Sequence, residues 1–363
     1  MKSMIRLYIR ILLFLVLLLV GRVNAQTNIS PDEIKFVRQG VRRFIFDENQ
    51  KVPLASLNPG ELIGMSAMHP TTLYSGIYPD VQLKNDQLFI QSDKESQASI
   101  WFGGFNPFAV YIIDIDMLSG HGEVGYEFSN PEKTEQFFIT ISHNGKEILD
   151  VNQKYVKESN TVVNQSIFNK GRGKYNIEKR IILQMLGSGF TLFVQKDGLP
   201  EPIVQSDFAS FIDLRKKQYI NSFQSNLYFS INKGLLAIDK IESALSSGMG
   251  LADIRAITYE DGEPLLDQGR LWYTMTIRGR ALPHHIQGVF SLNPTVFDLR
   301  FEGIILFDRN DGLLRNEVAS HIFFDRNEKC WRGLTTGFSA YANPEEKKQL
   351  LAIESKKDPR FGI

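Results

Sequence analysis

Cysteine is nearly absent from this sequence. Cys330 is the one cysteine among 363 residues, so no disulfide can form within the chain. A chain of this length can rely on a large hydrophobic core in place of disulfides. Cys330 lies next to Trp331 and no histidine adjoins it, so we expect a packing residue and not a nucleophile.

Several signatures of cofactor and metal chemistry are also missing. The sequence contains no glycine-rich phosphate loop, no paired-cysteine zinc spacing and no His-Glu-x-x-His pattern. These are the motifs that would indicate nucleotide-dependent or zinc-dependent chemistry. We therefore predict a protein that uses no metal and no cofactor.

The N-terminus lacks the length of apolar sequence that a transmembrane helix needs. Ile11–Val20 is an apolar run of ten residues, whereas crossing a bilayer takes about 20. Three basic residues precede the run, and Val-Asn-Ala at residues 23–25 follows it as a small-residue cleavage site. This order predicts a signal peptide over residues 1–25, with a membrane anchor as the alternative.

Charge of either sign is not in excess. The chain has 41 basic and 41 acidic residues, and removal of the leader takes four basic residues and no acids, which leaves 37 against 41. A mildly acidic exported chain has no electrostatic reason to bind nucleic acid. We predict a periplasmic or secreted bacterial protein with no nucleic-acid partner and no stable membrane insertion.

Short strands dominate the sequence after the leader. Residues 26–76 form an extension in which Ser30-Pro31-Asp32-Glu33 predicts the start of a short helix that ends at Gly40. Residues 77–243 then contain about ten short strand patterns, and Asn144-Gly145 between two of them is a strong hairpin signal. This spacing predicts an all-β sandwich of two sheets.

The sandwich resembles the jelly-roll, concanavalin-like lectin modules that accompany carbohydrate enzymes. The strings Phe190–Gly198 and Leu227–Ile231 carry this resemblance, which concerns architecture and not a binding site. Four aromatic residues in one strand and the turn after it are either a platform for stacking sugars or part of the core. They are Trp101, Phe102, Phe105 and Phe108.

The chain changes character in the linker at residues 246–250. A short apolar segment follows, then an acidic loop, and then the alternating strand Arg270–Ile277. Asp253 stands within the apolar segment, where a buried carboxylate would be costly unless it were paired or placed at a cleft floor. A similar unit, with Trp331 in place of Trp272, follows about 66 residues later, and serial antiparallel units of that size are typical of propeller blades.

Residues 244–363 resemble the five-bladed β-propeller glycoside hydrolases, the group of arabinanases, β-xylosidases and invertases. The resemblance lies in Gly250-Leu-Ala-Asp-Ile-Arg255, similar to the first-blade aspartate signature, and in residues 316–325 followed by Trp331. It implies that Asp253 is the catalytic base or nucleophile at the floor of the propeller funnel. The alternative is a capped aspartate with a structural role.

Three further residues are candidates for the substrate site. Arg255 lies two residues from Asp253 and on the same strand face, where it could bind an acidic sugar or form a plain ion pair. Glu317 and His321 share a face at the start of the second predicted blade. The general acid is expected from a later blade.

These observations predict an exported glycoside hydrolase that acts on plant or algal polysaccharide fragments, with an oligosaccharide or polysaccharide as its partner. The alternatives are a non-catalytic glycan-binding protein and a structural envelope protein. Because a propeller needs about four to eight blades to close, we also expect a chain truncated within its propeller, with two blades and no hydrolytic activity of its own. The sugar, the linkage and the oligomeric state are not predicted.

Overall fold

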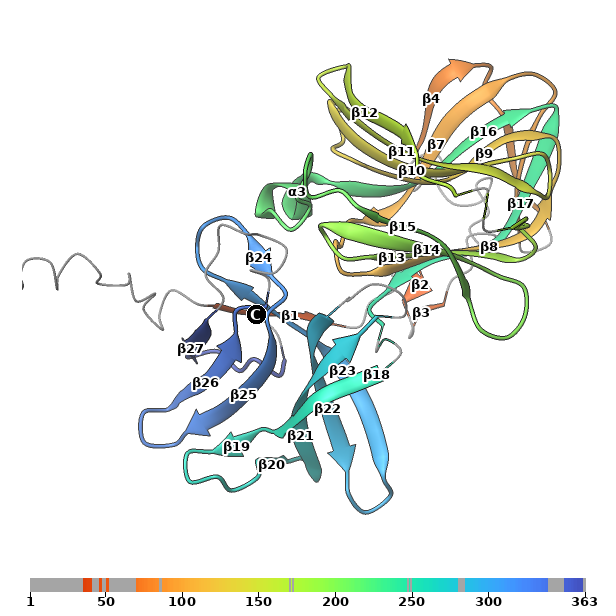
Figure 1. Cartoon of the computed structure of the whole chain (residues 1–363). Helices are drawn as coiled ribbons and strands as arrows, with labels where there is room; N and C mark the ends of the chain where they lie inside the picture. Colours follow the sequence, from red (N-terminus) through yellow and green to blue (C-terminus); the bar gives the residue numbers. More distant parts are fainter. Residues whose placement is uncertain are drawn as a thin grey trace, which may run out of the picture.

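The structure is a computed structural model of the chain (Figure 1). It describes residues 35–40, 46–47, 50–51, 70–84, 87–169, 171, 173–246, 248, 250–279, 285–338 and 349–361. The predicted signal peptide lies outside the described residues. Within them, no helix is long and apolar enough to cross a membrane.

Two seven-stranded antiparallel sheets form the first unit of the fold. The distal sheet, which lies farther from the C-terminal strands in Figure 1, has the order β12 (Asn160–Ser166), β11 (Ile148–Lys157), β10 (Glu135–His143), β9 (His121–Ser129), β16 (Gln224–Asn232), β7 (Ser96–Gly104) and β4 (Thr71–Gly76). The proximal sheet has the order β15 (Glu201–Asp207), β14 (Gly189–Gln195), β13 (Arg180–Met185), β8 (Val110–Leu118), β17 (Gly234–Ala244), β6 (Gln87–Ser92) and β5 (Asp80–Lys84).

The two sheets pack face to face over one aromatic-rich core. On β9, Val124, Tyr126 and Phe128 are fully buried, while the residues between them point to the opposite face of the sheet. Tyr126 also donates a hydrogen bond from its hydroxyl to the carbonyl of Tyr111 on β8, at 3.0 Å. The predicted all-β sandwich is confirmed, and it begins with β4 at Thr71.

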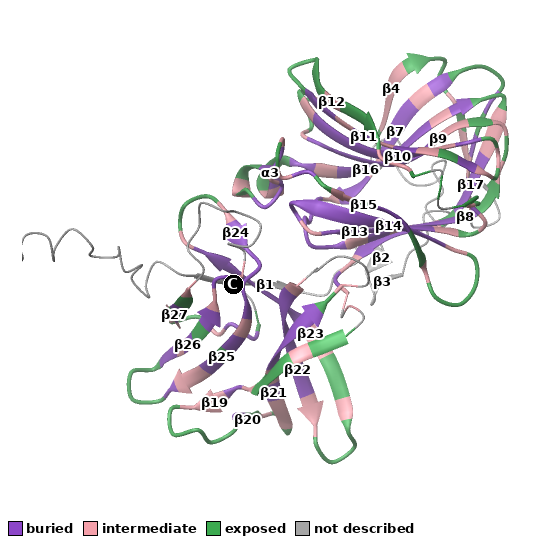
Figure 2. Cartoon of the chain, in the orientation of Figure 1, coloured by how far each residue is buried: buried purple, intermediate pink, exposed green. Residues whose placement is uncertain are grey.

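The C-terminal unit is a second pair of packed sheets. One has the order β1 (Lys35–Gly40), β23 (Asp298–Asp308), β22 (His285–Asn293), β21 (Arg270–Arg278) and β18 (Gly250–Ala256), with β20 (Leu266–Asp267) on β21 and β24 (Leu314–Arg315) on β23. The other has the order β19 (Thr258–Tyr259), β25 (Val318–Asp325), β26 (Cys330–Thr336) and β27 (Leu350–Ser355). Figure 2 shows buried residues on the strands of both units and exposed residues at many of the hairpin tips.

The prediction of a five-bladed propeller is wrong. The two tryptophan-containing strands, β21 and β26, belong to opposite sheets and share one core, which contains both Trp272 and Trp331. The guanidinium of Arg360 lies 4.7 Å from the Trp272 ring centroid and 5.2 Å from that of Trp331. The similarity between the two units therefore reflects two sheets of one sandwich and not successive blades.

The argument for missing blades fails for the same reason. Met275 and Ile277, on the apolar face of β21, are buried in a cluster with Phe108 of the first unit. The first unit thus covers a face that a neighbouring blade would cover in a propeller.

The N-terminal extension adds a strand in place of the predicted helix. Residues 35–40 form β1, which pairs antiparallel with β23 from Lys35 opposite Asp308 to Gly40 opposite Gly303. The extension also contains the short pair β2 (Phe46–Asp47) and β3 (Gln50–Lys51). The local sequence pattern predicted a helix, but in this segment the backbone hydrogen bonds to the edge strand β23 outweigh the helical preference.

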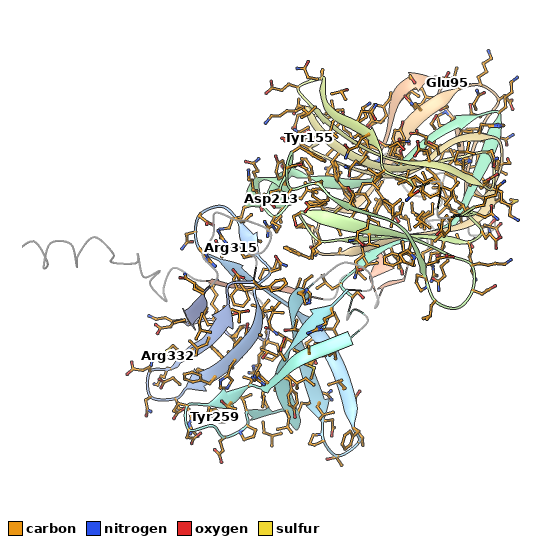
Figure 3. The ribbon with its side chains drawn as sticks, viewed as in Figure 1. Glu95, Tyr155, Asp213, Tyr259, Arg315 and Arg332 are labelled. Carbon is orange, nitrogen blue, oxygen red and sulfur yellow. The ribbon has the colours of Figure 1, made fainter. Side chains whose placement is uncertain are left out.

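The segment around helix α3 (Lys217–Ser222) joins the two units. Leu314 donates a backbone hydrogen bond to the carbonyl of Arg215, and Lys217 forms an ion pair with Asp308. Figure 3 shows Asp213 and Arg315 on facing sides of this junction. The junction combines the apolar cluster around Phe108 with these polar contacts, so the units are held together by more than the linker.

The buried His143 makes the stability of the first unit depend on pH. The residue is 3% exposed, and Nδ1 accepts a hydrogen bond from the backbone N–H of Gly145, so the neutral form is favoured. Burial, together with the nearby His121, lowers the pKa of His143 to about 4. An unfolded histidine titrates near about 6.5, so the unfolded chain binds the extra proton first as pH falls.

The contribution of His143 to the free energy of unfolding is therefore fully present above about pH 6.5 and is lost as the pH falls towards 4. We expect the free energy of unfolding of wild type to fall between pH 7 and pH 4.5 by about 2–3 kcal/mol more than that of His143→Asn, at about 1.4 kcal/mol per pKa unit. Urea denaturation of both proteins across this range measures the difference. Parallel pH profiles would contradict the assignment.

Candidate functional site

Asp253 and Arg255 lie on an exposed edge and not in a buried strand. Both are exposed on β18, where the pairing with β21 shifts between Ala252 and Arg255 as a bulge. Asp253 has a φ of 50°, a left-handed conformation that aspartate tolerates better than most residues. The premise that Asp253 is buried is wrong, and its catalytic role stays a prediction.

Glu317 and His321 are separated by the fold. Glu317 is fully buried and accepts an ion-pairing hydrogen bond from Nη2 of Arg309 at 2.8 Å, whereas His321 is exposed on β25. The pairing of β25 with β26 shifts between Val318 and His321, which breaks the alternation that would have put both on one face. Their role in substrate binding also stays a prediction.

A groove runs along the outward face of the distal sheet. Its volume is about 470 Å³, within the range of about 300–1,000 Å³ for small-molecule sites. Its lining comes from all seven strands of the sheet and the turn between β11 and β12: Tyr74, Gln97, Glu123, Gln136, Phe138, Thr140, Asn152, Lys154, Val156, Ser159, Thr161, Asn164 and Tyr228. We call this the distal groove.

The distal sheet is bent around the groove. Seven flat strands spaced about 4.8 Å apart would span nearly 30 Å, too far for one small hollow to touch both edges. Pairing shifts bend the flanks, between Leu73 and Ser75 where β4 meets β7 and between Tyr155 and Val156 where β11 meets β12. In Figure 1 the edge strands β4 and β12 stand higher than β10 in the middle of the sheet.

Three aromatic rings form the apolar part of the groove. The ring centroids of Phe138 and Tyr228 are 5.3 Å apart in an edge-to-face arrangement, and Tyr74 lies 6.3 Å from Phe138 and 6.2 Å from Tyr228. Such pairs are mutually stabilising beyond the area they bury. The rings come from strands β4, β10 and β16, so the cluster joins both halves of the groove.

Gly125 allows β9 and β10 to approach each other closely beneath the groove. It lies on β9 between β10 and β16, opposite Thr140 on one side and Tyr228 on the other. A Cβ atom built at Gly125 would lie 2.2 Å from the carbonyl oxygen of Ile139 and 2.8 Å from Cα of Thr140, both of them backbone atoms. A side chain at this position would have to displace the neighbouring strand.

A buried ionic network holds Tyr74 in place. The Tyr74 hydroxyl donates a hydrogen bond to Oε2 of Glu127 at 2.6 Å, and the Lys133 ammonium lies 2.7 Å from Oε1. Gln136 donates a longer hydrogen bond to Oε1 of Glu127, at 3.4 Å. Glu127 itself is fully buried, so this network fixes side chains of the groove without exposing its own carboxylate.

The network keeps Glu127 ionised. Burial alone would raise the pKa of its carboxyl, but the charge of Lys133 and the hydrogen bonds from Lys133 and Tyr74 outweigh burial and hold the pKa below its usual value. Burial, with the Glu127 charge beside it, raises the pKa of Tyr74 far above its usual range. The Tyr74 hydroxyl therefore remains a donor.

The turn between β11 and β12 forms one rim of the groove. Glu158 and Ser159 have φ values of 48° and 65°, which hairpin turns usually assign to Asn or Gly. The backbone N–H of Glu158 donates to the carbonyl of Thr134 at 2.7 Å, which ties the turn to the loop before β10. This contact holds Ser159 at the rim in a backbone conformation that serine rarely adopts.

The predicted aromatic platform belongs mainly to the core. Phe102, Phe105 and Phe108 are buried, and Trp101 is half-buried. The rings of the groove were missed because Phe138 and Tyr228 sit within continuous apolar strings, where alternation does not reveal the outward face. One sequence signal could have identified Phe138 as a groove residue. It lies two residues from Gln136 and two from Thr140, so it shares a strand face with polar side chains.

We expect Gly125→Ala to destabilise the first unit by about 1–3 kcal/mol, the usual cost of overpacking. The physical reason is the clash of the new Cβ with the backbone of β10. Urea denaturation measures the change. Gly250→Ala is the matched control, because Gly250 also lies in a strand without a positive φ and has no atom within 4 Å of a built Cβ.

Equal unfolding curves for Gly125→Ala and wild type would contradict the close approach of β9 and β10 at this position.

Metal ligands are not clustered in the described part of the chain, where no three His, Cys, Asp or Glu side chains could hold one ion.

No protein-family model matches the sequence, and no curated protein matches it. Several solved structures resemble the fold at low identity. The carbohydrate-binding module CBM66 of Bacillus subtilis is 11% identical, with a TM-score of 0.31 over 48% of this chain and 94% of that chain. β-Agarase A in complex with oligoagarose is 8% identical, with a TM-score of 0.36 over 61% of this chain and 97% of that chain. A glycosyl hydrolase family 16 protein of Mycobacterium smegmatis is 15% identical, with a TM-score of 0.32 over 48% of this chain and 91% of that chain.

Proposed function

We propose that the chain binds a glycan in the distal groove. The observation that carries this proposal is the combination of three clustered aromatic rings with a lining of amide and hydroxyl side chains. A sugar ring presents C–H groups on its faces and hydroxyls around its edge. Aromatic faces suit the former, and side chains that both donate and accept hydrogen bonds suit the latter.

The charges of the groove disfavour other polymers. A groove for single-stranded nucleic acid tracks the phosphates with many cations, whereas the described lining contains the cation Lys154 and the carboxylate Glu123. Peptides that add a strand to a sheet use its free edge, and this groove lies on a sheet face. A polyhydroxylated ligand fits the lining better than either.

Binding without cleavage is the form of the function that the groove supports. Glycoside hydrolysis generally uses two carboxyl groups on either side of the scissile bond. Among the lining residues that the structure describes, Glu123 is the one carboxylate, and Glu127 beneath them is closed off by Lys133 and Tyr74. Export, predicted from the leader, is part of the proposal because extracellular and periplasmic proteins meet polysaccharides.

Loss of the Tyr228 ring should weaken glycan binding. We expect Tyr228→Leu to reduce affinity by about tenfold or more, since truncating an aromatic residue that anchors a ligand commonly costs more than about 1 kcal/mol and about 1.4 kcal/mol is tenfold. Tyr228→Phe is the matched control: it keeps the ring and removes the hydroxyl, and its affinity should stay within about twofold to threefold of wild type.

The measurement is titration calorimetry against a panel of neutral and acidic plant and algal oligosaccharides, with thermal unfolding to show that both variants are folded. A release of new reducing ends by wild type would replace binding by hydrolysis. Tyr228→Leu that binds as wild type does, or a wild type that binds no member of the panel, would contradict the proposal.

A further inference from the structure

One end of the distal groove carries a cation for which the described residues supply no carboxylate partner. Lys154 lies on β11, and its ammonium is 5.6 Å from the ring centroid of Phe138 on the neighbouring strand. Among the described residues, the contact found for this ammonium is the one with the Phe138 ring, and no carboxylate lies within ion-pairing distance of it. A half-buried lysine is therefore held against an aromatic ring with its charge directed at the groove.

The lining around Lys154 is suited to donating hydrogen bonds. Asn164 stands directly opposite Lys154 in the pairing of β11 with β12, and Thr161 and Ser159 continue the rim. Amide, hydroxyl and ammonium groups can all donate. Glu158 precedes Ser159 in the turn between β11 and β12, but its side chain is exposed and does not line the groove.

The carboxylate of the groove lies at its other end. The register of β9 and β10 places Glu127 opposite Phe138 and Glu123 opposite Ser142, four residues farther along. At a rise of about 3.3 Å per residue this separates Glu123 from the level of Lys154 by about 13 Å. That exceeds the screening length of about 8 Å at physiological ionic strength, so Glu123 does not neutralise Lys154.

We propose that the distal groove selects an anionic glycan, with a uronate carboxylate or a sulfate ester of the sugar bound to the Lys154 ammonium. This inference rests on the proposed function and adds the class of ligand. The Phe138 ring stabilises the position of the Lys154 ammonium through a cation–π contact. The anion completes the ion pair that the protein itself leaves open.

The test uses pairs of oligosaccharides that differ in charge alone. Oligogalacturonates are compared with their methyl esters, and carrageenan oligosaccharides with their desulfated forms, by titration calorimetry on the full chain. Wild type should bind the charged member of at least one pair about tenfold more tightly, the effect of one charge-assisted contact. That preference should shrink as salt is raised.

Variants at position 154 test whether the preference for the charged oligosaccharide depends on the Lys154 ammonium. Lys154→Met keeps an unbranched stem on Phe138 and removes the charge, so the preference for the charged member should disappear. Lys154→Arg keeps the charge and should retain it. Lys157→Met is the matched control, because Lys157 lies on the same strand, is exposed and does not line the groove.

The outcomes separate the two proposals. Binding of neutral and charged members with equal affinity, or a charge preference that survives Lys154→Met, overturns the anionic ligand and leaves glycan binding in place. Binding of no oligosaccharide by wild type overturns both.

Discussion

The alternation of side chains along the distal sheet is the constraint on which both its core and its groove depend. Each strand sends one set of residues to the core and the next set to the groove, as Tyr126 and Phe128 do on one face of β9 and Gly125 and Glu127 on the other. A shift of one residue in the pairing would exchange the two sets. The hydrogen-bonded ladder that buries the aromatic core therefore also fixes the chemistry of the groove.

Much of the first unit was predictable from the sequence, because its signals are local. The alternating strands and the Asn144-Gly145 turn predicted an all-β sandwich, and β10 and β11 pair around that turn. The groove was not predictable, because it is assembled from strands far apart in the chain. The rings of Tyr74, Phe138 and Tyr228 come into contact because the sheet is bent. No single segment of the sequence predicts this bend or the outward direction of each ring.

The errors in the second unit came from treating a local resemblance as an arrangement in space. Two similar segments with a tryptophan can lie in neighbouring blades or in opposing sheets, and only the pairing partners of their strands distinguish these arrangements. The same applies to Asp253. An acidic residue in an apolar string indicates a costly burial unless a bulge turns it outward, and the bulge between Ala252 and Arg255 depends on the pairing of β18 with β21.

The pairing of β1 with β23 constrains the order in which the two units can fold during synthesis. Lys35 lies opposite Asp308, so most of the described chain separates two strands that are adjacent in one sheet. A ribosome produces β1 early and β23 late, and contacts of such long range are slow to form. The first unit can close its own sheets while synthesis continues, whereas β1 stays without its partner strand until β23 has been made. Assembly of the C-terminal sheet is therefore a late event that joins segments far apart in the polypeptide.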